Sequence, residues 1–460
     1  MTTHVFNPTI LREYDIRGIV GDTLNEADAY ALGRTFASKA RGEGARTIAV
    51  GRDGRTHSGM LEAQLIRGLT EGGVDVVQIG MGPSPMLYFA THYLDVDGGI
   101  QVTGSHNPAD YNGFKMLLKG RSVFGQEIQE IGQRAASGHW HAGSGTVEEV
   151  DIRAAYSDRL LKDFGGKAYS VGWDAGNGAA GPVLDMLVGR LPGRHHVIFS
   201  QVDGRFPNHH PDPTVEANLA DLKALVVREQ LDFGIAFDGD GDRIGAVDSR
   251  GRVIWGDQLM LILAEAVLKE EPGATIIADV KASQVLFDGI AALGGQPLMW
   301  KTGHSLIKSK MKETGAPLAG EMSGHIFFKH RWYGFDDALY AAVRLIEAVS
   351  ASGKSLTEIM DAMPKSVATP EMRFPVDEVR KFAIVDEVND RLATDGAKVD
   401  ATDGVRVNTD DGWWLLRASN TQDVLVARAE AKDQAGLDRL VDQIDDQLAK
   451  SGVTREEVAH

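Results

Sequence analysis

The sequence predicts an α/β protein of four domains, in which three similar mixed α/β units precede a smaller α+β domain. Three observations support this prediction. The chain has 460 residues, which is too long for one ordinary hydrophobic core. A short apolar run, a turn rich in Gly, Asp or Lys, and a helical pattern follow one another three times. The last part of the chain departs from that order and contains an Asp-Gly hairpin signal.

Each repeated unit is expected to supply three strands. The first strands are predicted at residues 47–50, 169–172 and 275–278, the second at 74–79, 197–199 and 297–300, and the third at 99–102, 233–237 and 316–319. Each third strand leads into a polar loop containing glycine, at residues 103–108, 238–243 and 320–325. Ligands bind at strand ends in α/β folds, so these three loops are predicted to be functional. Domain breaks are expected near residues 150, 252 and 366.

The final domain is predicted from a different set of elements. Residues 382–392 and 435–450 show amphipathic helical patterns. Residues 404–408 and 413–417 form a predicted hairpin around residues 409–412, and residues 424–430 are a further strand. Trp413 and Trp414 are expected to pack this domain with one ring on each face of a strand. The unusual loop at residues 417–421 follows the second hairpin strand.

Composition restricts the classes of protein to which the chain can belong. Hydrophobic residues make up 43 % and charged residues 25 %, as in an ordinary globular protein. No apolar run approaches the roughly 18 residues that span a bilayer, and the first residues lack the features of a secretory signal. The absence of cysteine excludes disulfides and thiolate chemistry and fits a cytoplasmic location. A net charge of −17 disfavours nucleic acid and anionic membranes, so a phosphorylated substrate requires basic residues gathered locally.

The loop at residues 238–243 is a candidate metal site. Asp238, Asp240 and Asp242 alternate with glycine after an apolar strand, so the backbone can turn and bring three carboxylates together. Carboxylate oxygens suit Mg²⁺ or Ca²⁺. An EF-hand begins in the same way, but its sixth position would be Arg243 instead of Gly and its twelfth Ser249 instead of Glu. We therefore expect a Mg²⁺ site with coordination places left for a substrate or phosphate oxygen.

The loop at residues 103–108 places a serine in a turn of small residues. Ser105 lies between Gly104 and His106, and this pattern differs from the Gly-x-Ser-x-Gly elbow of hydrolases. Serines in loops often cap a helix, so the loop by itself is a weak signal. Beside a carboxylate metal site, the Ser105 oxygen or its phosphoester becomes a plausible further ligand.

Four motifs together resemble the α-D-phosphohexomutase family, and most closely its bacterial phosphomannomutase/phosphoglucomutase branch. They are Thr-Gly-Ser-His-Asn-Pro, Asp-Gly-Asp-Gly-Asp-Arg, Gly-Glu-Met-Ser-Gly-His and Arg-Ala-Ser-Asn-Thr, in the family's order and spacing. The resemblance extends from Tyr14 to Thr421. It implies four domains around a central cleft: a phosphoserine-loop domain at 1–150, a metal-loop domain at 151–252, a sugar-recognition domain at 253–366 and a phosphate-binding domain at 367–460.

The resemblance also implies a role for each motif residue. Ser105 would carry the phosphate, and Asp238, Asp240 and Asp242 would hold Mg²⁺ with a phosphoserine oxygen. His304 or Lys115 would act as general acid or base beside Arg243. Substrate binding would involve a larger set: Tyr14, Arg17, His106, Lys281, Glu321, Ser323, His325, Arg417, Ser419, Asn420 and Thr421.

The implied reaction moves phosphate reversibly between the 1- and 6-positions of a mannose or glucose phosphate through a hexose 1,6-bisphosphate, which also serves as activator. Uncatalysed phosphate monoester cleavage is extremely slow, so positioning and charge neutralisation must supply a large barrier reduction. Water must be excluded, which suits a cleft that a last domain can close. The expected partner is a small phosphosugar, and the expected state is a monomer or weak dimer.

Two other functions remain open at this stage. A phosphoglucosamine mutase shares the serine and metal loops, although Met322 resembles the mannose/glucose branch. A non-catalytic phosphosugar or Ca²⁺-binding protein would not need Ser105. The chain departs from the family pattern at Gln422 and Asp423, where relatives often have an acidic or small residue and then proline.

Several other polar residues are predicted to be structural. The pairs His195-His196 and His209-His210 lack the further ligand spacing of a zinc site. Arg52 and Arg55 are expected to pair with Asp53 instead of binding phosphate.

Overall fold

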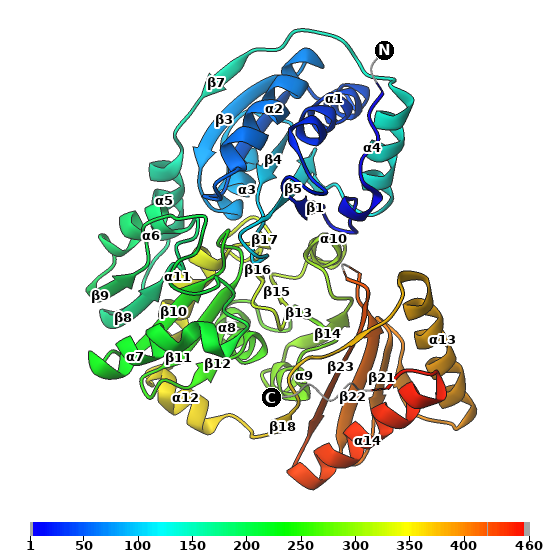
Figure 1. Cartoon of the computed structure of the whole chain (residues 1–460). Helices are drawn as coiled ribbons and strands as arrows, with labels where there is room; N and C mark the ends of the chain where they lie inside the picture. The colour runs from blue at the N-terminus through cyan, green and yellow to red at the C-terminus, as the bar shows by residue number, and fades with distance from the viewer. Residues whose placement is uncertain (1–2, 421, 455–460) are drawn as a thin grey trace.

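Four β-sheets organise the molecule, and we number the domains by these sheets. The computed structural model describes residues 3–420 and 422–454. Figure 1 shows the four domains surrounding the centre of the molecule, with domain 1 at the top and domain 4 at the lower right. None of the helices in the described part of the chain is long and apolar enough to cross a membrane.

Domain 1 contains a seven-stranded sheet in the order β1-β5-β4-β2-β3-β7, with β6 beside β5. The strands are β1 (Ile16–Ile19), β2 (Thr47–Arg52), β3 (Asp75–Met81), β4 (Gly98–Val102), β5 (Tyr111–Leu118), β6 (Arg121–Ser122) and β7 (Val147–Glu149). The helices are the 3₁₀ turn η1 (Pro8–Ile10), α1 (Glu26–Gly42), α2 (Ser58–Glu71), α3 (Ser84–Tyr93) and α4 (Gln126–Ser137). The connection to domain 2 passes through β7 along the outer edge of this sheet (Figure 1).

Domain 2 contains a five-stranded sheet in the order β12-β11-β10-β8-β9. The strands are β8 (Tyr169–Asp174), β9 (Gly193–Ile198), β10 (Phe233–Phe237), β11 (Ile244–Asp248) and β12 (Val253–Ile254). The helices are α5 (Arg153–Leu161), α6 (Gly181–Val188), η2 (Glu216–Leu219) and α7 (Ala220–Arg228).

Domain 3 contains a five-stranded sheet in the order β14-β13-β15-β16-β17. The strands are β13 (Thr275–Asp279), β14 (Gln296–Trp300), β15 (Leu318–Gly320), β16 (Ile326–Phe328) and β17 (Phe335–Asp336). The helices are α8 (Gly256–Glu270), α9 (Gln284–Ala292), α10 (His304–Thr314), α11 (Ala338–Ser352) and α12 (Leu356–Ala362).

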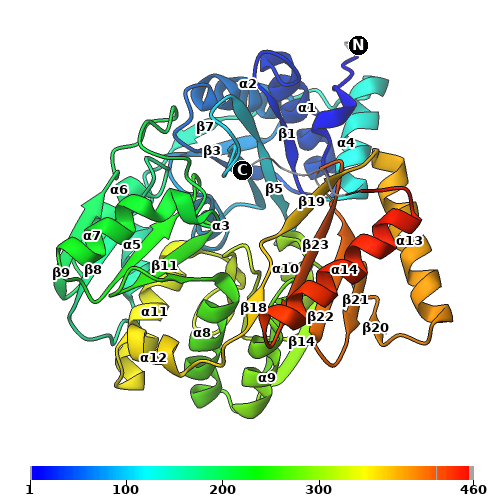
Figure 2. The same cartoon turned by 60° about the horizontal axis from the view of Figure 1, so that its bottom comes forward.

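Domain 4 contains a six-stranded sheet in the order β18-β23-β22-β21-β20, with β19 also paired to β23. The strands are β18 (Val367–Ala368), β19 (Met372–Pro375), β20 (Val399–Asp400), β21 (Val405–Asn408), β22 (Gly412–Ala418) and β23 (Val424–Ala431). Two helices, α13 (Glu378–Thr394) and α14 (Gln434–Lys450), pack on one face of this sheet (Figure 2). The four-domain α/β fold is therefore confirmed, and the boundaries at 150, 252 and 366 stay predictions.

The first three sheets share one strand order. In each, the first strand of the unit lies between the second and the third and is parallel to both. The third strand then turns back through a hairpin into an antiparallel partner. The three hairpin turns are the serine loop (residues 103–110), the aspartate loop (residues 238–243) and the glutamate loop (residues 321–325). The predicted repeat is thus a repeat of topology, and it places these loops at equivalent positions.

The hydrophobic cores do not coincide with the four sheets. Domain 1 and domain 4 each have a core of their own. Domains 2 and 3 share one large continuous core that also includes α3, and each has a smaller cluster of its own besides. Trp414 packs inside domain 4, and Trp413 packs from the opposite face against Val280 of domain 3. The two rings therefore lie on opposite faces as predicted, but Trp413 joins two domains. β9 begins at Gly193, earlier than predicted, and ends before Phe199.

Candidate active site

The three hairpin loops meet domain 4 around one cavity of about 1520 Å³. The fourth contributor is the arginine loop (residues 417–420), at the end of β22. Residues from all four domains line the cavity, including Ser105, Arg243, Glu321 and Arg417. The loops that are far apart in sequence therefore form one site.

Ser105 lies at the wall of this cavity in a strained conformation. Its φ is +49°, a left-handed value that is uncommon for non-glycine residues. The side chain is buried, with the residue 3 % exposed. Its Oγ donates a hydrogen bond to Asp238 Oδ2 at 3.0 Å and lies 3.2 Å from His106 Nδ1. A Cβ on Gly239 would lie 2.4 Å from the Ser105 carbonyl oxygen, so glycine permits the close approach of the aspartate loop.

Asp238, Asp240 and Asp242 form the candidate cation site. All three are fully buried, and one ligand oxygen from each lies within 4.8 Å of the others. Asp240 Oδ1 is buried and has no hydrogen-bond partner in the protein. Burial and repulsion from Asp240 and Asp242 raise the pKa of Asp238 well above its usual value. Concentrated negative charge and an unpaired oxygen fit a hard divalent cation bound by carboxylates.

Lys115 on β5 partly compensates this charge. Its Nζ donates to Asp240 Oδ2 at 2.7 Å and to Asp242 Oδ2 at 2.5 Å. Burial alone would lower the pKa of Lys115, but the two carboxylates outweigh it and raise the pKa well above the usual value. Lys115 is therefore a buried cation bound to two of the three aspartates.

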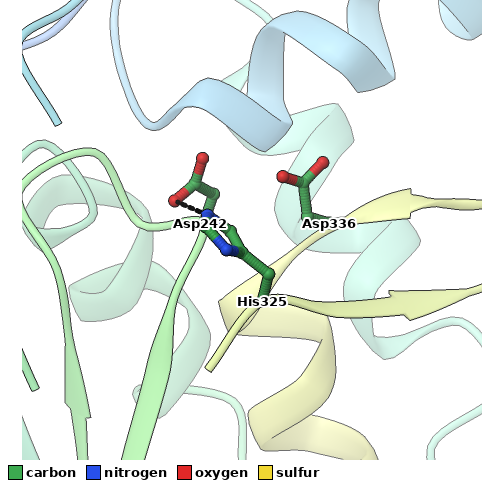
Figure 3. Close-up of side chains that lie close together, drawn as sticks. All are labelled: Asp242, His325 and Asp336. Carbon is green, nitrogen blue, oxygen red and sulfur yellow. Dashed lines mark ion pairs between the residues drawn. The ribbon is translucent and has the colours of Figure 1, made fainter. Parts of the chain in front are cut away.

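Asp242, His325 and Asp336 form a second buried group (Figure 3). His325 Nε2 lies 3.3 Å from Asp242 Oδ1, and Lys308 Nζ lies 3.0 Å from Asp336 Oδ1. Burial lowers the pKa of His325, but Asp242 and then Glu321 outweigh it and raise the pKa to about 9. A protonated His325 and Lys308 already balance the two carboxylates. The three aspartates are therefore the better candidate cation site.

His304 is the first residue of α10 and faces two other rings of the site. Its ring lies 5.9 Å from that of His325 and 5.7 Å from that of Tyr14. Burial, followed by repulsion from Lys308 and Lys115, lowers the pKa of His304 well below its usual value. Burial and Arg243 likewise lower the pKa of His106. Both imidazoles are therefore neutral at ordinary pH, and a neutral imidazole can accept a proton.

Basic side chains gather at the cavity although the whole chain is acidic. Arg17 donates to Gly104 O at 2.8 Å and to Asn107 Oδ1 at 2.6 Å, which places it against the serine loop. Arg243 Nε lies 3.3 Å from His325 Nε2. The cationic residues that line the cavity include Arg17, Lys115, Arg243, Lys281, Arg417 and Arg428. The same lining holds acidic residues, among them Asp15, Glu321 and Glu371, so the cations offer individual contacts for a phosphorylated ligand without making the whole cavity positive.

The glutamate loop presents a linked group of polar side chains. The Gly303 amide donates to Glu321 Oε1 at 2.5 Å, and His325 Nδ1 lies 2.9 Å from Glu321 Oε2. Ser323 Oγ lies 3.0 Å from His325 Nδ1. These contacts fix the carboxylate and hydroxyl that face the cavity.

Domain 4 meets domains 1 and 3 through the arginine loop. Asn420 Nδ2 donates to Tyr14 Oη at 2.6 Å, and Tyr14 Oη donates to Thr302 O at 2.9 Å. Arg417 Nε forms an ion pair with Asp403 at 2.9 Å. Ser419 Oγ accepts from the Gln422 amide at 3.2 Å. Thr421, also predicted for this loop, lies outside the described residues.

Lys281 approaches the cavity from the end of domain 3's first strand. Its Nζ pairs with Glu371 at 3.1 Å, next to the start of domain 4. The structure therefore brings every described residue of the predicted site to the walls of one cavity or to direct contacts within its loops.

Several residues that support the site were not predicted from the sequence. Ser84 donates to Asp240 Oδ2 at 2.5 Å, and Asp279 accepts from the Met322 amide at 3.0 Å. Arg55 pairs with Asp53 at 3.3 Å as predicted. The predicted pairing of Arg52 with Asp53 is wrong, because Arg52 pairs with the buried Glu62 at 3.1 Å.

His195 and His209 make structural contacts as predicted, whereas His210 lines the cavity. His195 accepts from Trp173 Nε1 at 3.1 Å, and His209 lies 3.0 Å from Asp174 Oδ2. Neither belongs to a group with the geometry of a metal site among the residues described.

Comparison with known proteins shows similarity over nearly the whole chain. Three segments match the family descriptions "Phosphoglucomutase/phosphomannomutase, alpha/beta/alpha domain" I, II and III, at residues 8–141, 154–251 and 255–367. Residues 371–447 match the description of the C-terminal domain of the same family. A phosphomannomutase/phosphoglucomutase of Pseudomonas aeruginosa is 46 % identical over 433 residues, 94 % of each chain. A phosphoglucomutase of Neisseria gonorrhoeae is 44 % identical over 436 residues, 94 % of this chain and 95 % of that protein.

Solved structures show the same similarity. A phosphoglucomutase/phosphomannomutase family protein from Burkholderia thailandensis superposes with a TM-score of 0.92 at 42 % identity, covering 97 % of this chain and 98 % of that one. A putative phosphomannomutase from Thermus thermophilus shares the fold, with a TM-score of 0.81 at 22 % identity and coverage of 97 % and 100 %.

Proposed function

Because the chain belongs to the phosphoglucomutase/phosphomannomutase family, we propose that it transfers a phosphoryl group reversibly between the 1- and 6-positions of hexose phosphates. The substrates are mannose and/or glucose phosphates, and the enzyme is an isomerase of the intramolecular phosphotransferase type. The observation that carries the proposal is the Ser105 hydroxyl, 3.0 Å from Asp238 at the wall of a cavity that all four domains line.

The reaction runs in two transfers through Ser105. A sugar hydroxyl oxygen attacks the phosphorus on Ser105, the Oγ–P bond breaks, and the hydroxyl proton passes to a base. The product is a hexose 1,6-bisphosphate. It turns round in the cavity, and Ser105 Oγ then takes the other phosphate while an acid returns a proton to the departing sugar oxygen. A cavity of about 1520 Å³ gives the bisphosphate space for this rotation.

The aspartate loop is the proposed Mg²⁺ site. Asp238, Asp240 and Asp242, with an oxygen on Ser105, would hold the ion, which when bound neutralises charge on the transferring phosphoryl group. The buried charge of the three carboxylates and the unpaired Asp240 Oδ1 support this assignment. Hexose 1,6-bisphosphate is the proposed activator, because it can restore the phosphate on Ser105.

The proton-transfer role belongs to His304 or Lys115. His304 has a lowered pKa and is neutral, so it can accept the sugar hydroxyl proton. Lys115 has a raised pKa and is bound to two carboxylates, which favours charge neutralisation as its main role. Arg243, the last residue of the aspartate loop, adds positive charge beside His325.

The remaining loops bind the sugar and the phosphate that does not react. Glu321 and Ser323 offer the acceptor and hydroxyl groups that suit sugar hydroxyls. Substrate binding further involves residues at the cavity or in its loops: Tyr14, Arg17, His106, Lys281, His325, Arg417, Ser419, Asn420 and, outside the described residues, Thr421.

Two alternatives fit less well. Relatives named phosphomannomutase/phosphoglucomutase favour mannose and glucose phosphates over glucosamine phosphate, in agreement with Met322. A non-catalytic binder would need neither the strained Ser105 nor the neutral His106 and His304 of the site. A cytoplasmic location and a monomeric or weakly dimeric state remain expectations.

Turnover assays test the proposal. Glucose, mannose and glucosamine 1-phosphates are compared with and without Mg²⁺ and a 1,6-bisphosphate, in the wild type and in Ser105→Ala. We expect turnover of the glucose or mannose phosphate that needs Mg²⁺ and is lost in Ser105→Ala. Ser137→Ala, an exposed serine of domain 1, is the control and should keep wild-type rates. Near-normal turnover by Ser105→Ala would refute the phosphoserine mechanism.

A further inference from the structure

A buried arginine lies beneath the serine loop without lining the cavity. Arg55 follows β2 and is 3 % exposed. Its guanidinium donates to Ser105 O at 2.7 Å, Asn107 O at 2.6 Å and Tyr111 O at 3.0 Å, and also to Pro108 O. One side chain therefore satisfies four backbone carbonyls of the serine loop and of the first residue after it.

Asp53 holds the start of the same loop. Its Oδ2 accepts from the Gly104 amide at 3.0 Å and pairs with Arg55 Nε at 3.3 Å. Its Oδ1 accepts from the Arg55 amide at 3.0 Å and from Ser58 Oγ at 2.5 Å. Asp53 and Arg55 thus bind the loop on either side of Ser105.

The serine loop needs such support because its conformation is unfavourable by itself. The left-handed backbone of Ser105 brings its Cβ too close to the following carbonyl oxygen. Each buried carbonyl left without a donor would also lose its solvation without compensation. Arg55 supplies donors to several of these buried carbonyls at once. It can do so in the loop conformation that presents Ser105 Oγ to Asp238, and therefore stabilises that conformation.

Domain 2 covers the arginine from the other side. The Arg55 guanidinium lies 5.1 Å from the ring centroid of Phe206. A Cβ on Gly204 would lie 2.4 Å from Arg55 Cα, so glycine permits this segment to pack closely. The arginine is enclosed between the domain that carries Ser105 and the domain that carries the aspartate loop.

We propose that Arg55, bound to Asp53 and covered by Phe206, is a positioning residue that fixes Ser105 relative to the aspartate loop. The inference rests on the proposed function, since it concerns the transfer through Ser105. Arg55 is not among the described residues that line the cavity, so its effect on the reaction passes through the backbone of the serine loop. A displacement of a reacting group by about 1 Å costs on the order of 10²-fold in rate.

A lysine cannot replace this arginine. Its single ammonium lacks the planar fork that reaches several acceptors at fixed geometry, although it keeps the charge. Arg55→Lys therefore separates the geometry of the guanidinium from its charge. Arg52 provides the matched control, because it ends the same strand and pairs with Glu62. Arg52→Lys should leave the serine loop undisturbed.

The test is steady-state kinetics of the full-length enzyme with saturating Mg²⁺ and activator, together with the rate of phosphate transfer from phosphorylated Ser105 in a single turnover. We expect Arg55→Lys to lower kcat and the single-turnover rate about 10²-fold with KM within about twofold of wild type. Arg52→Lys should stay within about twofold of wild type in both constants. An Arg55→Lys enzyme with wild-type kcat, or with KM raised in proportion to the loss of kcat, would overturn the proposal.

Phe206→Leu is a second test, which remains available if the Arg55→Lys variant does not fold. The Phe206→Leu variant keeps Arg55 and removes only the aromatic face over it. We expect a fall of about threefold to tenfold in kcat with unchanged KM, because the guanidinium is held less firmly. Unchanged kcat and KM would overturn the proposal. A wild-type enzyme without mutase turnover would instead refute the proposed function itself, so the two failures are distinguishable.

Discussion

At the scale of single residues, the site depends on how buried charges are balanced. Lys115 lies between Asp240 and Asp242, and all three are buried. Removing one partner of a buried charge network leaves uncompensated charge that costs about 3–5 kcal/mol. Lys115 therefore substitutes in part for a cation when the aspartate loop holds none.

This balance predicts the behaviour of Lys115→Met. We expect a lower melting temperature without Mg²⁺ and a larger increase on adding Mg²⁺ than in the wild type, because the metal becomes the main counter-charge. Turnover should fall by at least about 10²-fold, as expected for a group that neutralises charge at the reacting centre. Lys119→Met, an exposed lysine just beyond the same strand, is the control for differential scanning fluorimetry. Equal Mg²⁺ responses in Lys115→Met and wild type would contradict the argument.

Asp279 predicts a pH dependence of stability. Burial raises its pKa to about 6, while its oxygens accept from the Met322 amide and Thr302 Oγ1. Below the unfolded pKa of about 3.8 both states are protonated. As pH rises towards 6 the unfolded state loses its proton first, so this group's contribution to stability is lost in that range.

In Asp279→Asn this loss should be absent. As the pH rises from about 4 to about 7, the variant should therefore become more stable relative to the wild type, measured as the difference in their free energies of unfolding. Urea unfolding at several pH values measures it. A difference that does not change with pH would show that Asp279 does not titrate in this range.

The site residues that could be predicted from the sequence differ from those that could not in how their importance arises. Ser105 and the three aspartates lie in loops whose composition is unusual over several consecutive positions. Ser84 and Asp279 are single polar residues in ordinary surroundings. Their importance comes from partners far away in the chain, as with Ser84 and Asp240, 156 positions apart. Local sequence carries no signal of such contacts.

At the scale of elements, α10 connects the packing of domain 3 to the chemistry of the site. Gly303 precedes His304 with a φ of +133°, and a Cβ there would lie 2.4 Å from the phenol carbon and oxygen of Tyr14. The start of the helix therefore accepts only glycine. Its other end is open, because a Cβ on Gly315, whose φ is +75°, would have no neighbouring atom within 4 Å.

The two ends of α10 make a matched pair of variants. Gly303→Ala should displace His304 or Tyr14 and lower kcat/KM by at least about tenfold. Gly315→Ala should cost only about 1–2 kcal/mol of stability for its left-handed backbone and leave kcat/KM unchanged. Kinetics and thermal unfolding of both variants provide the measurement. A similar kcat/KM for the two variants would contradict this view of the helix.

Some buried strands were predicted and others were not: β11 is as buried as β10 and β5 is mostly buried, but both were missed beside the loops that precede them. β10 is fully buried and matches its prediction at residues 233–237. The first residues of β9, Gly193 and Arg194, are exposed, so the strand begins before its apolar part. β12 and β17 have two residues each, too few to show any period.

At the scale of the whole molecule, domain 4 is joined to domain 3 by a buried arginine. Arg406 donates to Val280 O at 2.6 Å and to Ala282 O at 2.9 Å, and its guanidinium lies 3.7 Å from the ring centroid of Trp413. Lys281 lies between the two carbonyls in sequence and lines the cavity. The contact therefore places the arginine loop relative to the rest of the site.

Arg406→Leu should loosen this contact. Two buried carbonyls would lose their donor, at about 1–3 kcal/mol each. We expect KM for the phosphosugar to rise roughly threefold to tenfold and proteolysis between residues 364 and 371 to become faster. Arg391→Leu is the control, because Arg391 bonds to Gln447 within domain 4. Unchanged KM and proteolysis in Arg406→Leu would show that other contacts suffice.

The number and order of domains could be predicted, but their mutual packing could not. The shared core of domains 2 and 3 forms from side chains of both units and of α3, and nothing in one unit's pattern indicates the other's. Trp413 shows the same limit, because its ring contacts Val280, which belongs to another domain.

The common hairpin of the first three sheets has a consequence for how such an enzyme can change. Three copies of one ancestral unit would inherit three equivalent tips, and each tip could then diverge without altering the strands that anchor it. The serine loop, the aspartate loop and the glutamate loop could then each change in sequence separately. Grafting residues 321–323 from a relative with another sugar preference should retune selectivity, while His325 keeps its contact with Asp242 and the phosphoryl chemistry stays in place.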